Sequence, residues 1–219
     1  MKNVNDFIHQ PYALIILLVC LSILPFIVVS CTSFLKIAVV FSLLRNALGI
    51  QQIPPNMAIY GLALILTFFI MAPVGMSIND NIQKEPFSIS DSSLYENIDR
   101  AVIKPYLSFL KKNTKAKQIR YFSQIGNKIW PKKYQQRLNE NSLFVMLPAF
   151  GIMQLDEAFK IGLLLYLPFV AIDLIVSNIL LALGMMMVSP TTISLPFKIM
   201  LFIIAGGWQY LIEKLVLSF

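Results

Sequence analysis

Three ionisable side chains lie within or beside long apolar stretches: Lys36, Arg45 and Asp173. A charge at bilayer depth is costly, so such residues usually pair, face a watery interior or carry function. Asp173 has the most apolar surroundings, and we expect it to pair with a cation, either Lys36 or one from a neighbouring subunit. For Lys36 and Arg45 an equally good interpretation is that they are anchors, with apolar stems and charged heads at a membrane face.

A second unusual feature is the run of three methionines, Met185, Met186 and Met187, between Gly184 and Pro190. Successive residues cannot share one helix face, because each residue turns the helix by about 100°. In a continuous helix they would be three ordinary hydrophobic side chains. Between a glycine and a proline the backbone can leave the helix, and methionine is flexible enough to fill an irregular gap. The sequence therefore also allows a compliant hydrophobic seal.

Patterns for catalysis or metal binding are missing from the sequence. The single histidine, His9, has no nearby carboxylate or cysteine, and Cys20 and Cys31 are not at metal-ligand spacing. The zinc-protease, phosphate-loop and serine-hydrolase motifs are absent. We therefore expect a protein that is not an enzyme and that uses no cofactor and no metal.

The composition explains why charges in apolar sequence matter here. Hydrophobic residues make up 57% of the 219-residue chain, charged residues only 13%, and the mean hydropathy is +0.71. A soluble fold of this length would leave much apolar surface in water, at a cost of roughly 0.8 kcal/mol per methylene. Lipid or partner subunits must cover the remainder, which predicts an integral membrane protein.

The apolar sequence falls into about four kinked helical segments, so the predicted fold class is all-α. The first, residues 11–44, contains Pro25, where we expect a kink or a break, giving a bent helix or a hairpin. The second is 57–78, the third 161–196 and the fourth 199–212. A tight turn at 45–56 joins the first two, and its marker residues are Arg45, Gln51, Gln52, Pro54 and Pro55.

A polar, helical domain is inserted between the second and third segments. The predicted regions are thus 1–78 (two hydrophobic segments), 79–141 (the polar domain) and 142–219 (two hydrophobic segments with a methionine-rich loop at 184–190). From Asp80 to Glu140 there are twelve Lys or Arg against six acids, a net charge of +6. A basic patch suits nucleic acid, anionic lipid or an acidic partner. Nucleic-acid-binding patterns are absent, so we expect no nucleic acid.

Four strings of sequence carry a family resemblance. They are residues 41–56 (FSLLRNALGIQQIPPN), 167–182 (LPFVAIDLIVSNILLA), 184–190 (GMMMVSP) and 195–198 (LPFK). These strings, with the LPAF step at 147–150 and the position of the polar segment, closely resemble the SctR/FliP family of export-apparatus proteins. The resemblance extends over nearly the whole chain. It is closest to the virulence-associated branch, because the flagellar members usually begin with a cleaved signal sequence and no convincing cleavage site is visible here.

The resemblance implies a core subunit of the export gate of a bacterial type III secretion system. Several copies, suspected to be five, would join the S and T gate subunits in a pore-forming assembly in the inner membrane. This multi-pass subunit would lie in the base of the secretion machine, contact other export-apparatus and needle-base components, and conduct unfolded secreted proteins. Carried over to this sequence, Met185, Met186 and Met187 would form the gasket that closes the channel.

Two points stay open at this stage. By charge alone the polar domain would be cytoplasmic, whereas the resemblance puts it in the periplasm and the Arg45 turn and Lys198 in the cytoplasm. We follow the resemblance, because counting positive charges is weak for loops of about 60 residues. The alternative functions are a small ion-coupled transporter using Asp173, which would usually show paired half-repeats, and a membrane enzyme, which lacks a catalytic pair.

Overall fold

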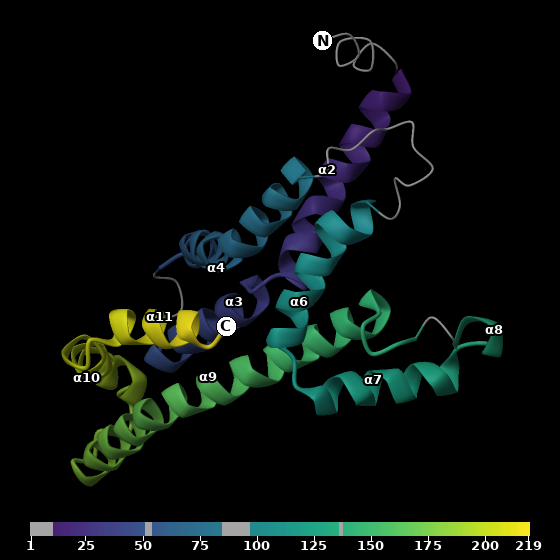
Figure 1. Cartoon of the computed structure of the whole chain (residues 1–219). Coiled ribbons are helices and arrows are strands. Elements are labelled where there is room, and N and C mark those ends of the chain that lie inside the picture. The colour runs from purple at the N-terminus through teal and green to yellow at the C-terminus, as the bar shows by residue number, and fades with distance from the viewer. Residues whose placement is uncertain (1–10, 51–53, 85–96, 136–137) are drawn as a thin grey trace.

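The computed structural model describes residues 11–50, 54–84, 97–135 and 138–219, and these residues form helices and turns without a strand. The prediction of an all-α protein is confirmed (Figure 1). The helices are α2 (Pro11–Cys31), α3 (Phe34–Leu48), α4 (Asn56–Lys84), the short π-helical turn η1 (Asp99–Ile103), α6 (Lys104–Lys112), α7 (Ala116–Ile129), α8 (Lys132–Gln135), α9 (Leu143–Ala182), α10 (Pro190–Ile204) and α11 (Gly207–Leu217).

Two of these helices, α4 and α9, are long and apolar enough to cross a membrane on their own. The α2–α3 pair is bent by 70° and the α10–α11 pair by 60°, and each pair passes the same test as one broken span. Counting the pairs as spans gives four in the described part of the chain. This number agrees with the four kinked hydrophobic segments that the sequence predicts.

The bend between α2 and α3 is not at Pro25, where the sequence placed it. Helix α2 runs through Pro25, and the break falls at Thr32 and Ser33. The Thr32 hydroxyl donates a hydrogen bond to the Val28 carbonyl and accepts one from the Phe34 amide. These local side-chain bonds offer the backbone an alternative to continuing the helix. A proline removes only one backbone bond, which a long apolar helix can tolerate.

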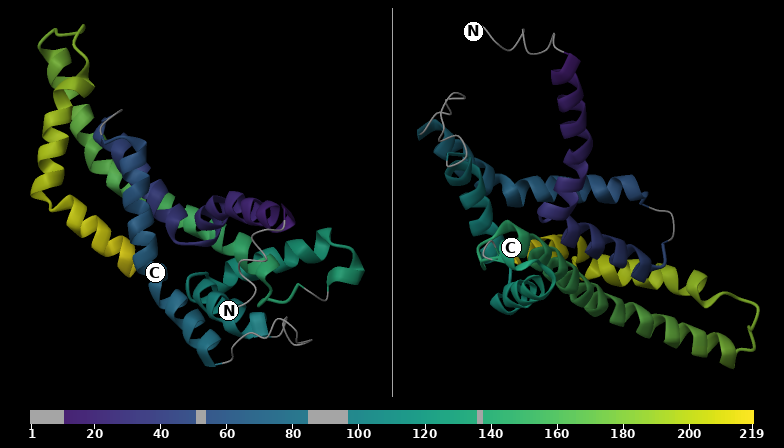
Figure 2. Two further views of the ribbon diagram at one scale, coloured as in Figure 1. Left: turned by 90° about the horizontal axis from the view of Figure 1, so that it is seen from above. Right: turned by 90° about the vertical axis from the view of Figure 1, so that its right-hand side faces the viewer.

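Helix α9 is the longest element and connects the polar and apolar parts of the molecule. Its 40 residues extend for about 60 Å. The sequence predicted a hydrophobic segment only from residue 161 on, but the structure extends one helix from Leu143 to Ala182. Pro148 and Pro168 lie inside it. Figure 2 shows α6 and α7 beside the amino-terminal part of α9, and α10 beside its carboxyl-terminal part.

Two hydrophobic clusters hold the described residues together. The larger is built around α3, whose Ile37, Val40 and Leu44 are completely buried against α4, α9 and α11. The smaller lies between the polar region and the start of α9 and consists of Leu110, Ile119, Leu138, Val145, Met146, Ala149 and Phe150. The polar region therefore packs on residues that the sequence assigned to the carboxyl-terminal region, and α4 extends six residues past the boundary predicted at residue 78.

The contact between α3 and α9 depends on a glycine. A Cβ added at Gly162 would lie 2.2 Å from Leu43 Cδ1 and 3.0 Å from Leu43 Cβ. Small residues at such positions let two apolar helices approach closely. The position is therefore closed to larger side chains unless Leu43 or the helix moves.

We predict that Gly162→Ala lowers the free energy of unfolding by about 1 to 3 kcal/mol, the usual cost of overpacking. The measurement is thermal unfolding of the full chain in mild detergent. Gly151→Ala in the same helix is the control, because a Cβ there meets nothing within 4 Å and alanine favours the helix by up to about 1 kcal/mol. Equal stability of the two variants would contradict the proposed close approach.

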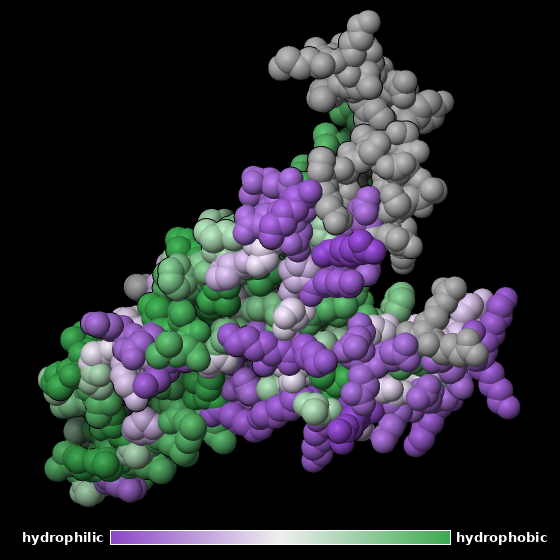
Figure 3. Space-filling view, viewed as in Figure 1, coloured by the Kyte–Doolittle hydropathy of each residue, from purple (hydrophilic) through white to green (hydrophobic). Residues whose placement is uncertain are grey.

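Apolar side chains cover much of the surface. Figure 3 shows them over the part formed by α10 and the carboxyl-terminal half of α9, whereas polar side chains dominate around α6, α7 and α8. Phe68, Leu164, Leu183 and Ile204 are each more than 60% exposed. Exposed apolar side chains that gather on one part of a single chain mark contact with lipid or with other proteins.

Candidate functional site

The methionine run lies in the turn that connects α9 to α10. Helix α9 ends at Ala182, and Gly184 follows in the left-handed conformation with a φ of 72°, which glycine adopts at little cost. Helix α10 begins with Pro190, whose missing N–H is harmless at a first helical position. The structure thus places residues 185–187 in a turn bounded by this glycine and this proline. Their role as a seal stays a prediction.

The side chains in this methionine turn (residues 184–189) are unusually exposed. Met185 is 44% exposed, Met186 80% and Met187 102%. Thioether side chains of this kind gain from apolar contact, and within the described residues Met187 receives almost none. The turn can therefore offer a flexible apolar surface to a partner or to another copy of itself.

Asp173 is paired, but its partner differs from the one predicted. Its carboxylate accepts hydrogen bonds of 2.6 Å from Lys198 Nζ and of 2.6 Å from the Ser194 hydroxyl. Lys198 also donates to the Ala47 carbonyl at 3.3 Å. This polar network (Asp173, Ser194, Lys198 and the Ala47 carbonyl) joins α9, α10 and α3. Both carboxylate oxygens are bonded, which does not favour the ion-coupled transporter as the alternative function.

Lys36 finds its anion elsewhere on α9. Its Nζ lies 2.9 Å from Glu157 Oε2, 3.5 Å from the Ser218 carbonyl oxygen and 4.5 Å from the centre of the Phe219 ring. The residue is completely buried, so it is not the snorkelling anchor that the sequence also allowed. The predicted pairing of Lys36 with Asp173 is wrong, because Glu157 and Asp173 lie sixteen positions apart, about 24 Å along α9.

Sequence reasoning missed Lys198 and Glu157 as the partners of these two charges. Lys198 is only 3% exposed, and its location on the cytoplasmic side stays a prediction. Its position in the apolar helix α10 could have identified it as a partner. A lysine in apolar surroundings needs an anion, as Asp173 needs a cation. Glu157 lies in a polar stretch with Asp156 and Lys160, so its sequence surroundings give no sign of burial.

The turn after α3 is described only in part. Gly49 ends the helix with a φ of 78°, and Arg45 Nη1 donates a hydrogen bond to Asn56 Oδ1 across the turn. Pro54 and Pro55 come immediately before α4. Gln51, Gln52 and the single histidine, His9, lie outside the described residues. That this turn faces the cytoplasm stays a prediction.

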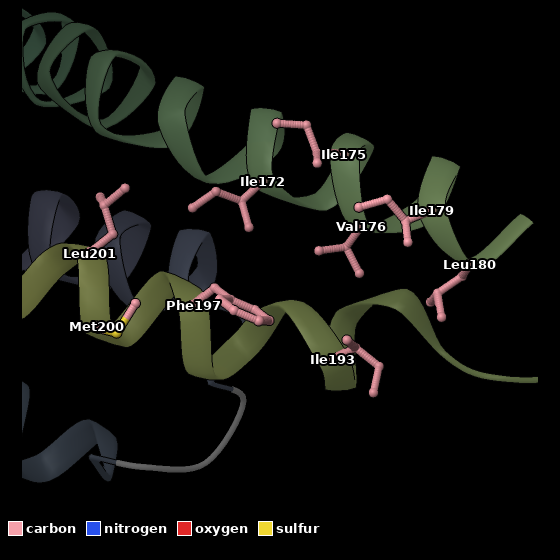
Figure 4. A pocket seen from close by; sticks show the side chains of 9 residues that line it. All are labelled: Ile172, Ile175, Val176, Ile179, Leu180, Ile193, Phe197, Met200 and Leu201. Atoms are coloured by element: carbon pink, nitrogen blue, oxygen red, sulfur yellow. The ribbon is translucent and has the colours of Figure 1, made fainter. Parts of the chain in front are cut away.

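A groove without polar side chains lies between the carboxyl-terminal part of α9 and α10 (Figure 4). Its volume is about 470 Å³. Nothing in its lining can transfer a proton or hold an ion, so its chemistry is limited to apolar contact. It is lined by Ile172, Ile175, Val176, Ile179, Leu180, Ile193, Phe197, Met200 and Leu201. These residues are recognisable as apolar from the sequence, but the groove between them is not.

Comparison with known proteins gives consistent matches along the chain. The model of the FliP family matches residues 17–215. Yop proteins translocation protein R of Yersinia pestis is 53% identical over 206 residues, which cover 94% of this chain and 95% of that protein. Virulence protein YscR of Salmonella typhimurium is 51% identical over 211 residues, with 96% and 97% covered.

A more distant relative extends the same match. Harpin secretion protein HrcR of Erwinia amylovora is 41% identical over 220 residues, which cover 99% of both chains. The family model and the relatives thus span the apolar helices, the polar region and the methionine turn alike. The resemblance seen in the sequence is confirmed, and the chain belongs to the FliP family.

Proposed function

We propose that this protein is a structural, pore-forming subunit of the export gate of a type III secretion system in the bacterial inner membrane. It shapes a passage for unfolded secreted proteins and catalyses no covalent reaction. The names of its relatives, which refer to translocation, virulence and harpin secretion, support a role in secretion. The observation that best supports a pore-forming role is the exposed methionine turn at the end of the apolar hairpin of α9 and α10.

The methionine turn has the properties that a gasket needs. Three consecutive side chains project from one turn, and the two most exposed, Met186 and Met187, have few neighbours in their own chain. When several copies surround an axis, these side chains meet and exclude water and ions. Methionine is unbranched and adaptable, so the same side chains can repack around a passing polypeptide.

The exposed apolar helices supply the surfaces for assembly. The groove between α9 and α10 offers only aliphatic, aromatic and thioether side chains, which suits an apolar helix from a neighbouring subunit. We propose that copies of this chain, five in number, assemble with the S and T gate subunits and contact other export-apparatus and needle-base components. The polar region lies on the periplasmic side, and the turn at Arg45 lies on the cytoplasmic side.

The double variant Met186→Ala and Met187→Ala tests the gasket. We expect it to assemble normally but to make the membrane leaky to ions, because alanine cannot fill the space that two long side chains occupy. The measurement is ion flux through vesicles that contain the assembled complex. Unchanged flux in a correctly assembled complex would contradict the gasket.

Matched substitutions elsewhere separate the gasket from a general loss of methionine. Met57 and Met76 are 85% and 66% exposed, and both lie on α4, away from the methionine turn. Their joint replacement by alanine removes the same volume of exposed apolar side chain. We expect the ion flux of this control to match that of the unsubstituted complex.

A further inference from the structure

A buried polar layer separates the two hydrophobic clusters along α9. On this helix the smaller cluster ends at Phe150 and the larger begins at Ala158. Between them α9 meets the start of α3 and the turn between α6 and α7. Burial removes polar groups from solvent, so the residues of this layer need hydrogen-bond partners within the fold. The layer contains these residues, each less than a tenth exposed: Ser33, Lys36, Asn113, Thr114 and Gln154.

Three of these residues carry an oxygen that is buried without a hydrogen-bond partner among the described residues. They are the hydroxyls of Ser33 and Thr114 and the side-chain carbonyl of Gln154. Ser33 stands at the N-cap of α3, where a serine usually bonds to the first helix amides, but its hydroxyl makes no capping bond. Buried polar atoms are almost always satisfied. Each of the three oxygens therefore needs a partner that the described residues do not supply.

The side chains of Ser33 and Gln154 lie on facing turns of α3 and α9. The close contact at Gly162 and the ion pair of 2.9 Å between Lys36 and Glu157 show that the two helices run in the same direction. Ser33 lies three residues before Lys36. Gln154 lies three residues before Glu157. Because residues three apart share a helix face, the register that pairs the lysine with the glutamate also brings Ser33 to Gln154.

The turn between α6 and α7 holds Thr114 against the same part of α9. Gln154 Nε2 donates a hydrogen bond of 3.1 Å to the Asn113 carbonyl. The backbone amide of Lys115 donates one of 3.0 Å to Met153 Sδ. Thr114 lies between these two anchored residues, and its hydroxyl is enclosed. The three unpaired oxygens thus come from three segments that meet at one turn of α9.

We propose that an ordered water molecule binds in this layer and joins the three oxygens. It donates one hydrogen bond to Gln154 Oε1 and accepts one from each hydroxyl, those of Ser33 and Thr114. About three hydrogen bonds to otherwise unpaired groups are typical of a buried water. A bridging water holds two polar groups nearly as well as a direct bond. It therefore fastens the polar region to the first turn of α3 and to α9.

The charges around the layer favour a neutral ligand over an ion. Lys36 and Lys115 share the single carboxylate of Glu157, so the net positive charge repels a cation. A chloride ion would face the partial negative charge of Gln154 Oε1, and turning the amide would break its bond to the Asn113 carbonyl. Water can donate to this oxygen and accept from the hydroxyls, which neither ion can do.

Radiolytic labelling of the full chain in mild detergent tests the site. A short X-ray pulse splits water into hydroxyl radicals, which oxidise exposed side chains and also buried ones that touch a bound water. Met153 is the reporter, because its thioether adjoins the layer and is readily oxidised to the sulfoxide. We expect Met153 to be oxidised several times faster than Met146, which lies about two turns away on α9 within the smaller cluster.

The double variant Ser33→Ala and Thr114→Val removes two of the three partners of the water. We expect the oxidation rate of Met153 to fall close to that of Met146, because the water is lost with its partners. Met153 is 9% exposed and Met146 1%, so a rate that stays high in the variant would mean that bulk solvent reaches Met153. This outcome would overturn the site.

Two further variants separate loss of the water from a disturbed fold. Thr67→Val removes another buried hydroxyl, which bonds to the Ala63 carbonyl within α4, and it should leave the Met153 rate unchanged. An equal fall in this control would contradict the proposal. Thr114→Ser keeps the hydroxyl and should keep the rapid oxidation of Met153, whereas Thr114→Val alone should slow it.

Replacing chloride with gluconate in the buffer distinguishes water from an anion. We expect the Met153 oxidation rate and the melting temperature of the chain to be the same in both salts. A lower melting temperature without chloride would assign the layer to an anion and would overturn the proposal.

Discussion

Replacing Asp173 with asparagine is expected to lower the free energy of unfolding by about 3 kcal/mol, because it leaves a buried cation unpaired. Lys198 is almost completely buried, and its ammonium group would keep only the Ala47 carbonyl and a neutral amide as partners. The measurement is thermal unfolding of the purified full chain in mild detergent. We also expect α10 to detach from α9 at lower temperature than in the unsubstituted protein, which limited proteolysis would detect.

Replacing Lys198 with methionine should lower the free energy of unfolding less than Asp173→Asn does. This difference between the two variants is the sharper test. Lys198→Met removes the buried charge and leaves Asp173, whose side chain is 31% exposed and can be partly hydrated. Combining Asp173→Asn with Lys198→Met should recover most of the stability lost in Asp173→Asn alone, because no buried charge then remains unpaired. Additive losses in the double variant would mean that the two residues do not interact.

Replacing Glu157 with glutamine is expected to have a similar effect at the other charged site, again about 3 kcal/mol. Lys36 has no exposed surface, and its remaining contacts, the Ser218 carbonyl and the Phe219 ring, carry no full negative charge. We expect the carboxyl-terminal residues to loosen together with α3. Unfolding in detergent and hydrogen exchange of residues 215–219 measure the two consequences.

The neighbouring position provides a matched control. Asp156 forms an ion pair with Lys160 in which both side chains are more than half exposed, and ion pairs this exposed contribute little to stability. Asp156→Asn makes the same chemical change one residue away on the same helix. A loss in Asp156→Asn as large as the loss in Glu157→Gln would refute the special role of the buried pair.

The sequence alone predicted the fold class, the turn that holds the three methionines and the need of Asp173 for a cation. Each of these depends on local information: apolar length, a glycine and a proline, and one acid in apolar surroundings. Which lysine pairs with Asp173 does not depend on local information. Lys36 and Lys198 both lie in apolar helices, and only the packing of α3 and α10 against different parts of α9 decides which lysine meets which acid.

The continuity of α9 was also beyond local reasoning. The sequence predicted a hydrophobic segment only from residue 161 on, but the helix runs through the polar residues 154–160, and two of them are held by contacts with other elements. Gln154 bonds to the Asn113 carbonyl, and Glu157 binds two lysines from other elements. At Pro25 the sequence predicted a bend, but the helix continues through this proline and the bend lies at Thr32. The groove between α9 and α10 escaped prediction because its walls come from two separate helices.

The close contact at Gly162 falls at the midpoint of α9 and divides the helix into two arms of equal length. One arm carries the basic region, and the other ends at the three methionines. If α9 tilted as a rigid rod by about 5° about this contact, each end, about 30 Å away, would move by roughly 3 Å in opposite directions.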